Sequence, residues 1–215
     1  MRGLILKDLY NLKKSGKSLI VVLAAFSILF FSQDNMGFLN GYIVILASML
    51  VINTMSYDNM AKWDKYALTM PVTRRDVVFS KYLVSIIVTF IGAAIAIVLC
   101  FAQGIYKHNL DALEILAVTG AVVAAGFLFI SIMLPFIYKF GIEKSRILIF
   151  LVFLVPAGIV VIGKSKFTKL QFSPLAVQYM HIILQYLPII LLLITILVMV
   201  VSYSISVKVY GNKDM

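Results

Sequence analysis

The amino-acid sequence predicts an all-α membrane protein whose helices cross a bilayer about six times. Of its 215 residues, 62% are hydrophobic and 13% are charged, and the mean hydropathy is +1.04. Soluble domains lie nearer half apolar and a quarter charged. The apolar residues also gather in runs close to the roughly 20 residues that a helix needs to cross the hydrocarbon core. The six runs lie at 18–32, 38–57, 79–103, 112–137, 147–163 and 186–207.

The lysine and arginine residues predict the orientation of these spans. Most of the 19 lie in alternate segments, beginning with the amino-terminal one, while the opposite side holds only Lys107, Lys164, Lys166 and Lys169. Cytoplasmic loops carry the excess of such residues. We therefore expect a multi-pass protein of the plasma membrane with both termini in the cytoplasm. The net charge of +10 is explained by these flanking cations, so a nucleic-acid partner is not expected.

The chain offers little that is typical of catalysis or metal binding. Cys100 is the only cysteine, and His108 and His181 are isolated, so neither a disulfide framework nor a metal cluster is expected. Charged residues are absent from the centres of all six runs, which disfavours ion-coupled transport and proton relays. None of the residue pairs of intramembrane proteases is visible either. We expect no catalytic residue, no metal and no cofactor in this chain.

Residues 1–17 are predicted to form an interfacial helix that lies along the cytoplasmic leaflet. After it, the chain is expected to turn at Gly16 into the first span. A simple membrane anchor and a functional role are equally compatible with this pattern. The apolar face of the helix would carry Met1, Ile5, Leu9 and Leu12.

The cytoplasmic segment 57–76 is the most informative part of the sequence. We expect a short amphipathic helix that Pro71 ends. Thr73 then resembles a helix N-cap, and Asp76 three residues later completes a capping box. An amphipathic helix held in the cytoplasm by two spans is suited to docking a partner protein; the alternative is that it lies flat on the membrane. Its apolar stripe would consist of Met60, Trp63, Ala67 and Met70.

The outer segment 164–186 is predicted to contain a short outer or re-entrant helix. Ser173 would cap it, Pro174 would occupy its first position, and Pro188 would kink the chain before the last span. Two further local features concern the spans themselves. Asp111 and Glu114 are expected to satisfy the amino end of the fourth span. Small residues four positions apart predict close helix contacts at Gly92 with Ala96 and at Gly120 with Ala124.

The most distinctive part of the sequence lies between Tyr57 and Tyr82. It contains Asp58, Lys62 to Leu68, Met70-Pro71-Val72, Arg74-Arg75-Asp76 and Ser80-Lys81-Tyr82. On these residues, and in its layout along the whole chain, the sequence resembles the permease subunits of type-2 ABC exporters from Gram-positive bacteria. More narrowly, the chain is similar to permeases that export amphipathic peptide toxins, the phenol-soluble modulin exporters.

This resemblance implies an ATP-driven exporter in which a separate ATPase subunit, present in two copies, binds ATP and magnesium. It implies a second permease, either a homodimer or a close paralogue, and an amphipathic peptide or lipid-like substrate. The 57–76 segment would be the coupling helix that sits in a groove of the ATPase. There Trp63, Tyr66 and Met70 would pack into the groove, and Asp58, Lys62, Asp64, Arg74 and Arg75 would form salt bridges.

Two other functional interpretations of the sequence are possible. A non-transporting membrane scaffold or a sensor subunit could use the same fold, and the sequence alone does not exclude it. A membrane enzyme is less compatible with the sequence, because Glu114 and Glu143 stand alone and both histidines lie near outer loops.

Overall fold

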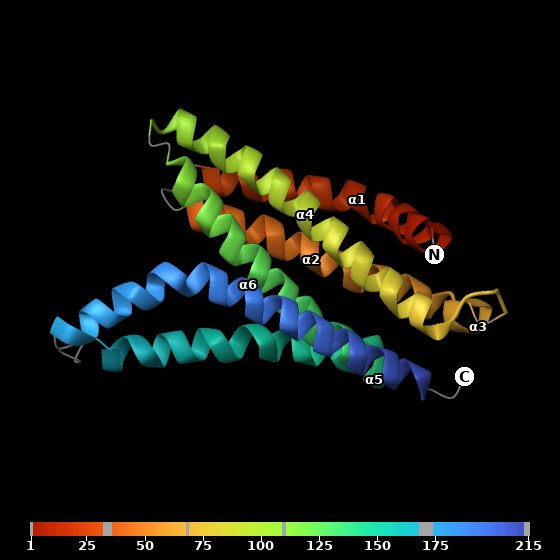
Figure 1. Cartoon of the computed structure of the whole chain (residues 1–215). Helices are drawn as coiled ribbons and strands as arrows, with labels where there is room; N and C mark the ends of the chain where they lie inside the picture. Colours follow the sequence, from red (N-terminus) through yellow and green to blue (C-terminus); the bar gives the residue numbers. More distant parts are fainter. Residues whose placement is uncertain (1, 32–35, 68, 109–110, 168–173, 213–215) are drawn as a thin grey trace.

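The computed structural model describes residues 2–31, 36–67, 69–108, 111–167 and 174–212, and within them the side chains of most residues from 149 to 189 are not described. The described residues are entirely helical apart from turns, which confirms the all-α prediction. The helices are α1 (Arg2–Phe31), α2 (Met36–Met60), α3 (Trp63–Ala67), α4 (Arg74–Tyr106), α5 (Ala112–Phe167) and α6 (Pro174–Gly211) (Figure 1).

Four segments of the described chain are long and apolar enough to cross a membrane. They are Gly37–Met60, Arg74–Tyr106, Ala112–Ser145 and Ile190–Gly211. These cover three of the predicted runs and most of the last one, so the protein is a polytopic membrane protein. The runs at 18–32 and 147–163 fall on α1 and on the last part of α5, where many side chains lie outside the described set. Six crossings therefore stay a prediction.

Gly141 divides α5 into two helices that run in different directions. Its backbone angles are φ 79° and ψ 172°, a region that is essentially restricted to glycine. In Figure 1 the green part of α5 approaches this corner and the teal part runs back along α6. The connection expected between the fourth and fifth spans is thus a single-residue corner inside α5.

Helix α2 packs against α1, α4 and α5, and α6 packs against α4 and α5. Glycines allow two of these contacts to be close. A Cβ atom at Gly92 would lie 2.4 Å from Ala47 Cβ, and one at Gly126 would lie 2.7 Å from Ser48 Oγ. The predicted close contact at Gly92 is therefore confirmed. The one predicted at Gly120 is wrong, because nothing lies within 4 Å of a Cβ atom there.

Both ends of the chain lie at the same end of the helix bundle, together with α3 (Figure 1). The larger core cluster lies there and includes Val78, Met133 and Tyr210. A second cluster, including Ile43 and Ala96, joins α2, α4 and the start of α5. The end that holds the termini is the one where segment 57–76 lies.

The predicted turn at Gly16 is absent, and the predicted outer helix is not separate from the last span. Helix α1 is continuous through Gly16, where a turn was expected, because a glycine inside a helix costs only about 1 kcal/mol and does not by itself end it. Helix α6 runs on through Pro188, so the short outer helix predicted before the last span is part of α6. Figure 1 shows that α6 is bent along its length. Membrane helices tolerate proline because neighbouring groups satisfy the freed carbonyl. Residues 168–173, including the predicted cap Ser173, lie outside the described residues.

Candidate functional site

Four charged side chains from three helices meet near the end of the bundle that holds the termini, and we term them the charged cluster. Lys7 and Asp8 come from α1, Asp58 from the last turn of α2, and Lys81 from α4. Lys81 Nζ lies 2.8 Å from Asp8 Oδ1 and 2.6 Å from Asp58 Oδ2. Lys7 Nζ lies 2.6 Å from Asp58 Oδ1 and 3.2 Å from Asp8 Oδ1.

The charged cluster is electrically balanced and largely removed from solvent. Asp8 and Lys81 are buried, and Asp58 and Lys7 are only partly exposed. An isolated buried charge is strongly disfavoured, whereas a paired and hydrogen-bonded one is tolerated. Lys81 Nζ also lies 3.4 Å from Thr54 Oγ1. Moving α1, α2 or α4 alone would leave a buried charge without its partner, so the cluster fixes these three helices relative to one another.

Trp63 connects the short helix α3 to this cluster. Lys7 Nζ lies 4.3 Å from the centroid of the Trp63 ring, within the range of a cation–π interaction. The ring is half-buried and packs against the larger core cluster. Trp63 therefore faces the bundle rather than projecting from it as the outermost residue of a docking surface.

The chain between α2 and α4 consists of two short turns around α3. Lys62 adopts a left-handed conformation, with φ 49°, and separates α3 from the end of α2. This break makes the predicted continuous stripe from Met60 to Met70 wrong: Ala67 is fully buried, while Met60 is 81% exposed. A stripe at helical spacing shares one face only while the helix continues.

The predicted cap of α4 is confirmed. Asp76 N donates to Thr73 Oγ1 at 3.2 Å, and Thr73 N donates to Asp76 Oδ2 at 3.0 Å, which is the reciprocal capping box. Val72 N also donates to Met70 O at 2.7 Å, closing a tight turn around Pro71. The corner that directs the chain from α3 into α4 is therefore well defined. At the far end of the bundle, Asp111 Oδ1 accepts from Leu113 N and Glu114 N, as expected at a helix start.

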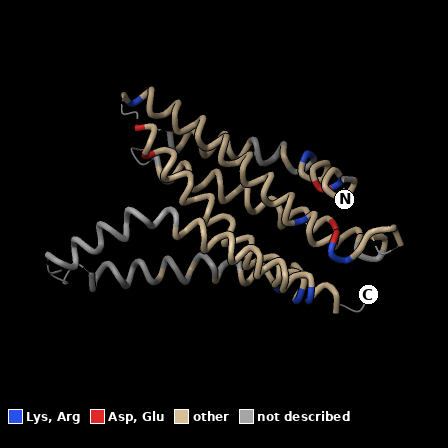
Figure 2. The backbone as a smooth tube through the Cα atoms, viewed as in Figure 1, with Lys and Arg blue, Asp and Glu red and all other residues tan. Residues whose placement is uncertain are grey.

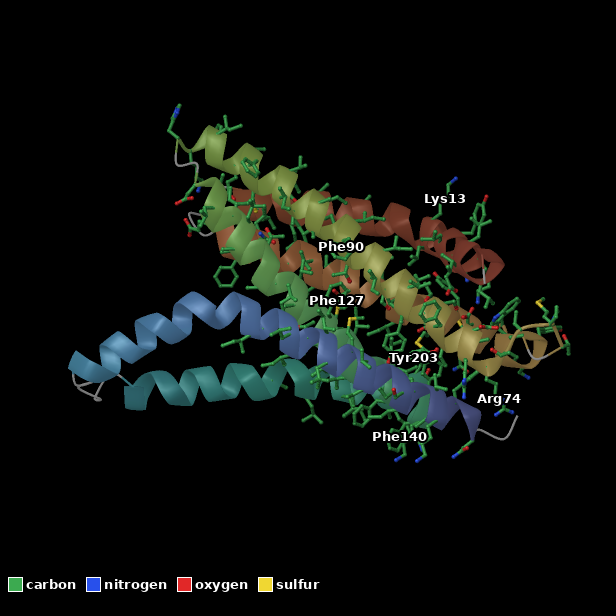
Figure 3. The ribbon with its side chains drawn as sticks, viewed as in Figure 1. Lys13, Arg74, Phe90, Phe127, Phe140 and Tyr203 are labelled. Carbon is green, nitrogen blue, oxygen red and sulfur yellow. The ribbon has the colours of Figure 1, made fainter. Side chains whose placement is uncertain are left out.

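Arg74 links this corner to the carboxyl end of α6. Its Nη1 donates to Tyr210 O at 3.2 Å and to Gly211 O. The last carbonyls of a helix have no intrahelical partner, and a basic side chain satisfies them and favours the negative end of the helix dipole. Figure 3 shows Arg74 beside the end of α6. Segment 57–76 is thus attached to α6 as well as to α1, α2 and α4.

Four of the residues predicted to dock a partner are exposed, and we term them the docking face. Tyr66 is 62% and Met70 is 46% exposed, and Lys62 and Arg75 are exposed as well. The predicted contacts Asp58, Trp63 and Arg74 instead bond within the chain, as described above. The Asp64 side chain lies outside the described set.

Hydroxyl groups extend the contacts of α4 toward α5 and α6. Tyr82 OH lies 2.6 Å from Ser202 Oγ and 2.9 Å from Ser206 Oγ. Ser202 Oγ in turn donates to Ser131 O at 2.5 Å. The ring of Tyr82 meets that of Tyr203 edge to face, with centroids 5.6 Å apart. More than two turns beyond the cap, α4 is therefore bonded to α6, which in turn is bonded to α5.

Sequence reasoning missed the charged cluster. Lys7 and Lys81 enter the sequence analysis as cations that orient the spans, Lys81 also as part of the family likeness, and Asp8 has no predicted role. The missed signal was the position of Asp8 on α1. Leu4 and Asp8, one turn apart, are the buried residues among the described side chains of that helix, whereas Ile5 and Leu9 on the predicted apolar face are only half-buried. A carboxylate on the buried face of a membrane helix requires a cation from another helix.

The described residues bring no group of three or more histidine, cysteine, aspartate or glutamate side chains together as metal ligands. The described contacts instead join segment 57–76, with its exposed face, to four long helices through ion pairs and hydrogen bonds. Such an arrangement is suited to transmitting movement from that face to the helices. No curated protein and no solved structure matches the chain. Residues 3–211 match the family described as ABC-2 family transporter protein. This match covers almost the whole chain, and the protein therefore belongs to the ABC-2 family of transporter proteins, as a transmembrane component of an ABC transporter.

Proposed function

We propose that the chain is the permease of an ATP-driven exporter and that it binds its ATPase subunit through the docking face. The ABC-2 family implies an ABC ATPase as the partner. The observation that carries the proposal is the combination at segment 57–76. Its exposed residues include an aromatic side chain, a thioether side chain and two cations, while its inner side is bonded to α1, α2, α4 and α6. Aromatic, Met and Arg side chains are enriched at protein interfaces.

The charge distribution supports a cytoplasmic position for this end of the bundle. Figure 2 shows that the described lysines and arginines gather around both termini and segment 57–76. The opposite end of the described chain carries Lys107 with Asp111 and Glu114. By the positive-inside rule, this distribution supports a cytoplasmic docking face, where ATP would be available to the partner. Both chain ends share that side.

ATP binding and hydrolysis would take place on the partner, and the permease would convert movement of the docking face into movement of its helices. The charged cluster would transmit displacement of α3 to α1, α2 and α4, and Arg74 would transmit it to α6. Because these contacts are ion pairs and hydrogen bonds with defined geometry, they couple the helices more directly than a flexible loop would.

The complete transporter would contain two permeases and two ATPases, with a second copy of this chain or a close paralogue as the other permease. By its resemblance to peptide-toxin exporters of Gram-positive bacteria, the chain would carry an amphipathic or hydrophobic substrate, of which peptides are the first choice. The described polar groups inside the bundle are compatible with such a substrate. Asn40 Nδ2, for example, donates to Thr119 Oγ1 at 2.6 Å between α2 and α5, with no charge involved.

The decisive experiment is to purify the tagged full-length chain from its native membrane in mild detergent and to measure how much ATPase subunit accompanies it. We expect the ATPase in equal amount, and its loss in Tyr66→Ala and Arg75→Glu variants. Leu113→Ala is the matched control, since Leu113 is 79% exposed at the opposite end of the bundle. All three variants should keep the thermal stability of the unaltered chain.

The outcomes separate the two functions that the fold allows. Co-purification with the ATPase together with ATP-dependent export from reconstituted vesicles would establish the exporter. A stable chain that purifies without any ATPase in several detergents would favour the scaffold or sensor subunit instead. Retention of the ATPase by both docking-face variants would show that the partner binds elsewhere.

A further inference from the structure

Helices α5 and α6 form the two sides of an open groove of about 460 Å³ on the outside of the bundle. This volume lies within the roughly 300–1,000 Å³ of ligand pockets. The groove lies between the first part of α5 and the last turns of α6. Its walls include Ile132, Phe136 and Phe140 from α5 and Val201 and Ile205 from α6.

The groove is apolar along its length. These five wall residues are each between 37% and 49% exposed, so they contribute an apolar lining without filling the groove. Ser131 and Ser202 also border it, but Ser202 Oγ donates to Ser131 O and is hydrogen-bonded to Tyr82 OH. A ligand in the groove would therefore meet hydrocarbon over most of its surface.

One end of the groove is cationic. Lys139 borders it, and its Nζ lies 5.1 Å from the centroid of the Phe140 ring. Lys208, next to the wall residue Val209, and Lys144, beyond the corner at Gly141, are both exposed. Glu143 is the acidic residue nearest to them in the sequence. Figure 3 shows Phe140 at the end of the bundle that holds the termini, and Figure 2 shows lysine and arginine residues gathered there.

An apolar groove with cations at its membrane-surface end is complementary to a molecule with a hydrocarbon chain and an anionic head group. We propose that the groove binds one anionic phospholipid, with an acyl chain between α5 and α6 and the phosphate at Lys139. Basic pockets between membrane helices recognise such head groups, and the ammonium group would donate charge-assisted hydrogen bonds to the phosphate.

A second copy of the chain fits the groove less well. A second copy would have to supply the anion for Lys139 from one of its own acidic side chains at the same end of the bundle. Among the described ones, Asp8 and Asp58 are paired within the charged cluster, and Asp76 caps α4. Glu143 is left as the exposed carboxylate, and it lies beyond the corner at Gly141, directly before Lys144 in the sequence. The membrane supplies an anion that is not already bonded. The proposal depends only on the membrane location of the chain, and it would hold for an exporter and for a scaffold alike.

The test uses the full-length chain in detergent micelles, titrated with phosphatidylglycerol or with phosphatidylcholine of the same acyl chains, with binding followed by native mass spectrometry. We expect the first phosphatidylglycerol to bind about tenfold more tightly, equivalent to about 1.4 kcal/mol. Lys139→Gln should abolish this preference, and it is an exposed substitution that should not affect folding. Lys107→Gln, at the opposite end of the bundle, should preserve the preference.

Three results would overturn the proposal. Equal affinities of the unaltered chain for the two lipids would show that no anionic head group is recognised. A preference that survives Lys139→Gln would locate the recognition elsewhere. A disulfide-linked dimer formed through Val201→Cys in native membranes would show that a second copy occupies the groove. The native Cys100 is buried and provides the background for that cross-linking measurement.

Discussion

Lys81 and Asp8 form a buried ion pair, 2.8 Å from Nζ to Oδ1, that joins α4 to α1 across 73 positions of sequence. Asp58 of α2 accepts from the same ammonium group at 2.6 Å. Three helices are thereby fixed at one point, directly behind the segment that we propose binds the ATPase. Stability and coupling should consequently depend on the same side chains.

Replacing Asp8 by Asn should destabilise the fold by about 3–5 kcal/mol, because Lys81 and Lys7 would then share a single buried carboxylate. The measurement is the unfolding free energy in detergent micelles, followed by circular dichroism. Asp111→Asn is the matched control: it makes the same chemical change at a helix N-cap, where Asn and Asp serve almost equally well. A loss below about 1 kcal/mol for Asp8→Asn would contradict the structural role of the pair.

The double variant Asp8→Asn, Lys81→Gln should lose less stability than the sum of its two single variants. Removing both charges leaves the balanced pair of Lys7 and Asp58, whereas each single variant leaves one charge in excess. A double-mutant cycle measures this difference directly. Strictly additive losses would mean that Lys81 and Asp8 do not interact energetically.

Lys7→Gln should make the Trp63 ring more accessible to acrylamide. Helix α3 has five residues, too few to be stable without tertiary contacts, and the Lys7 ammonium group lies over its tryptophan. Because Trp63 is the only tryptophan of the chain, its fluorescence quenching reports on α3 alone. Lys13→Gln changes an exposed residue of α1, the helix that also carries Lys7 (Figure 3). It should leave the quenching constant unchanged. An equal response in both variants would rule out a specific contact.

The features predicted correctly from the sequence are those that local chemistry specifies. Apolar runs required a membrane, and the spacing of Thr73 and Asp76 predicted a capping box that is present. Each of these signals lies within one helix or one turn. They are read from propensity and periodicity without knowledge of the neighbours.

The remaining features depend on contacts between distant segments. The charged cluster unites α1, α2 and α4, and no single stretch of sequence shows that Asp8 faces Lys81. Trp63 was expected to point outward because an aromatic residue in a mixed-charge segment suits an interface; the left-handed turn at Lys62 reorients it. The close contact at Gly126 was likewise missed, since it depends on the position of Ser48 in α2.

Gly141→Ala should destabilise the corner of α5 by about 1–3 kcal/mol, since its φ of 79° and ψ of 172° strain any residue with a Cβ atom. No other atom lies within 4 Å of a Cβ at this position, so the loss would reflect backbone strain and not crowding. Gly158→Ala, in the second part of the same helix, is also uncrowded and should be neutral or stabilising. Unfolding free energies in detergent compare the two; equal effects would contradict the strained corner.

Gly92→Ala should cost about 1–3 kcal/mol, because its Cβ atom would lie 2.4 Å from Ala47 Cβ and force α2 and α4 apart. Gly120→Ala makes the same chemical change where space is free, and it should gain up to about 1 kcal/mol from the higher helix propensity of alanine. Unfolding free energies should therefore change in opposite directions. Since α4 also carries Lys81, a parallel loss of ATPase binding in Gly92→Ala alone would connect the α2–α4 contact to the docking face.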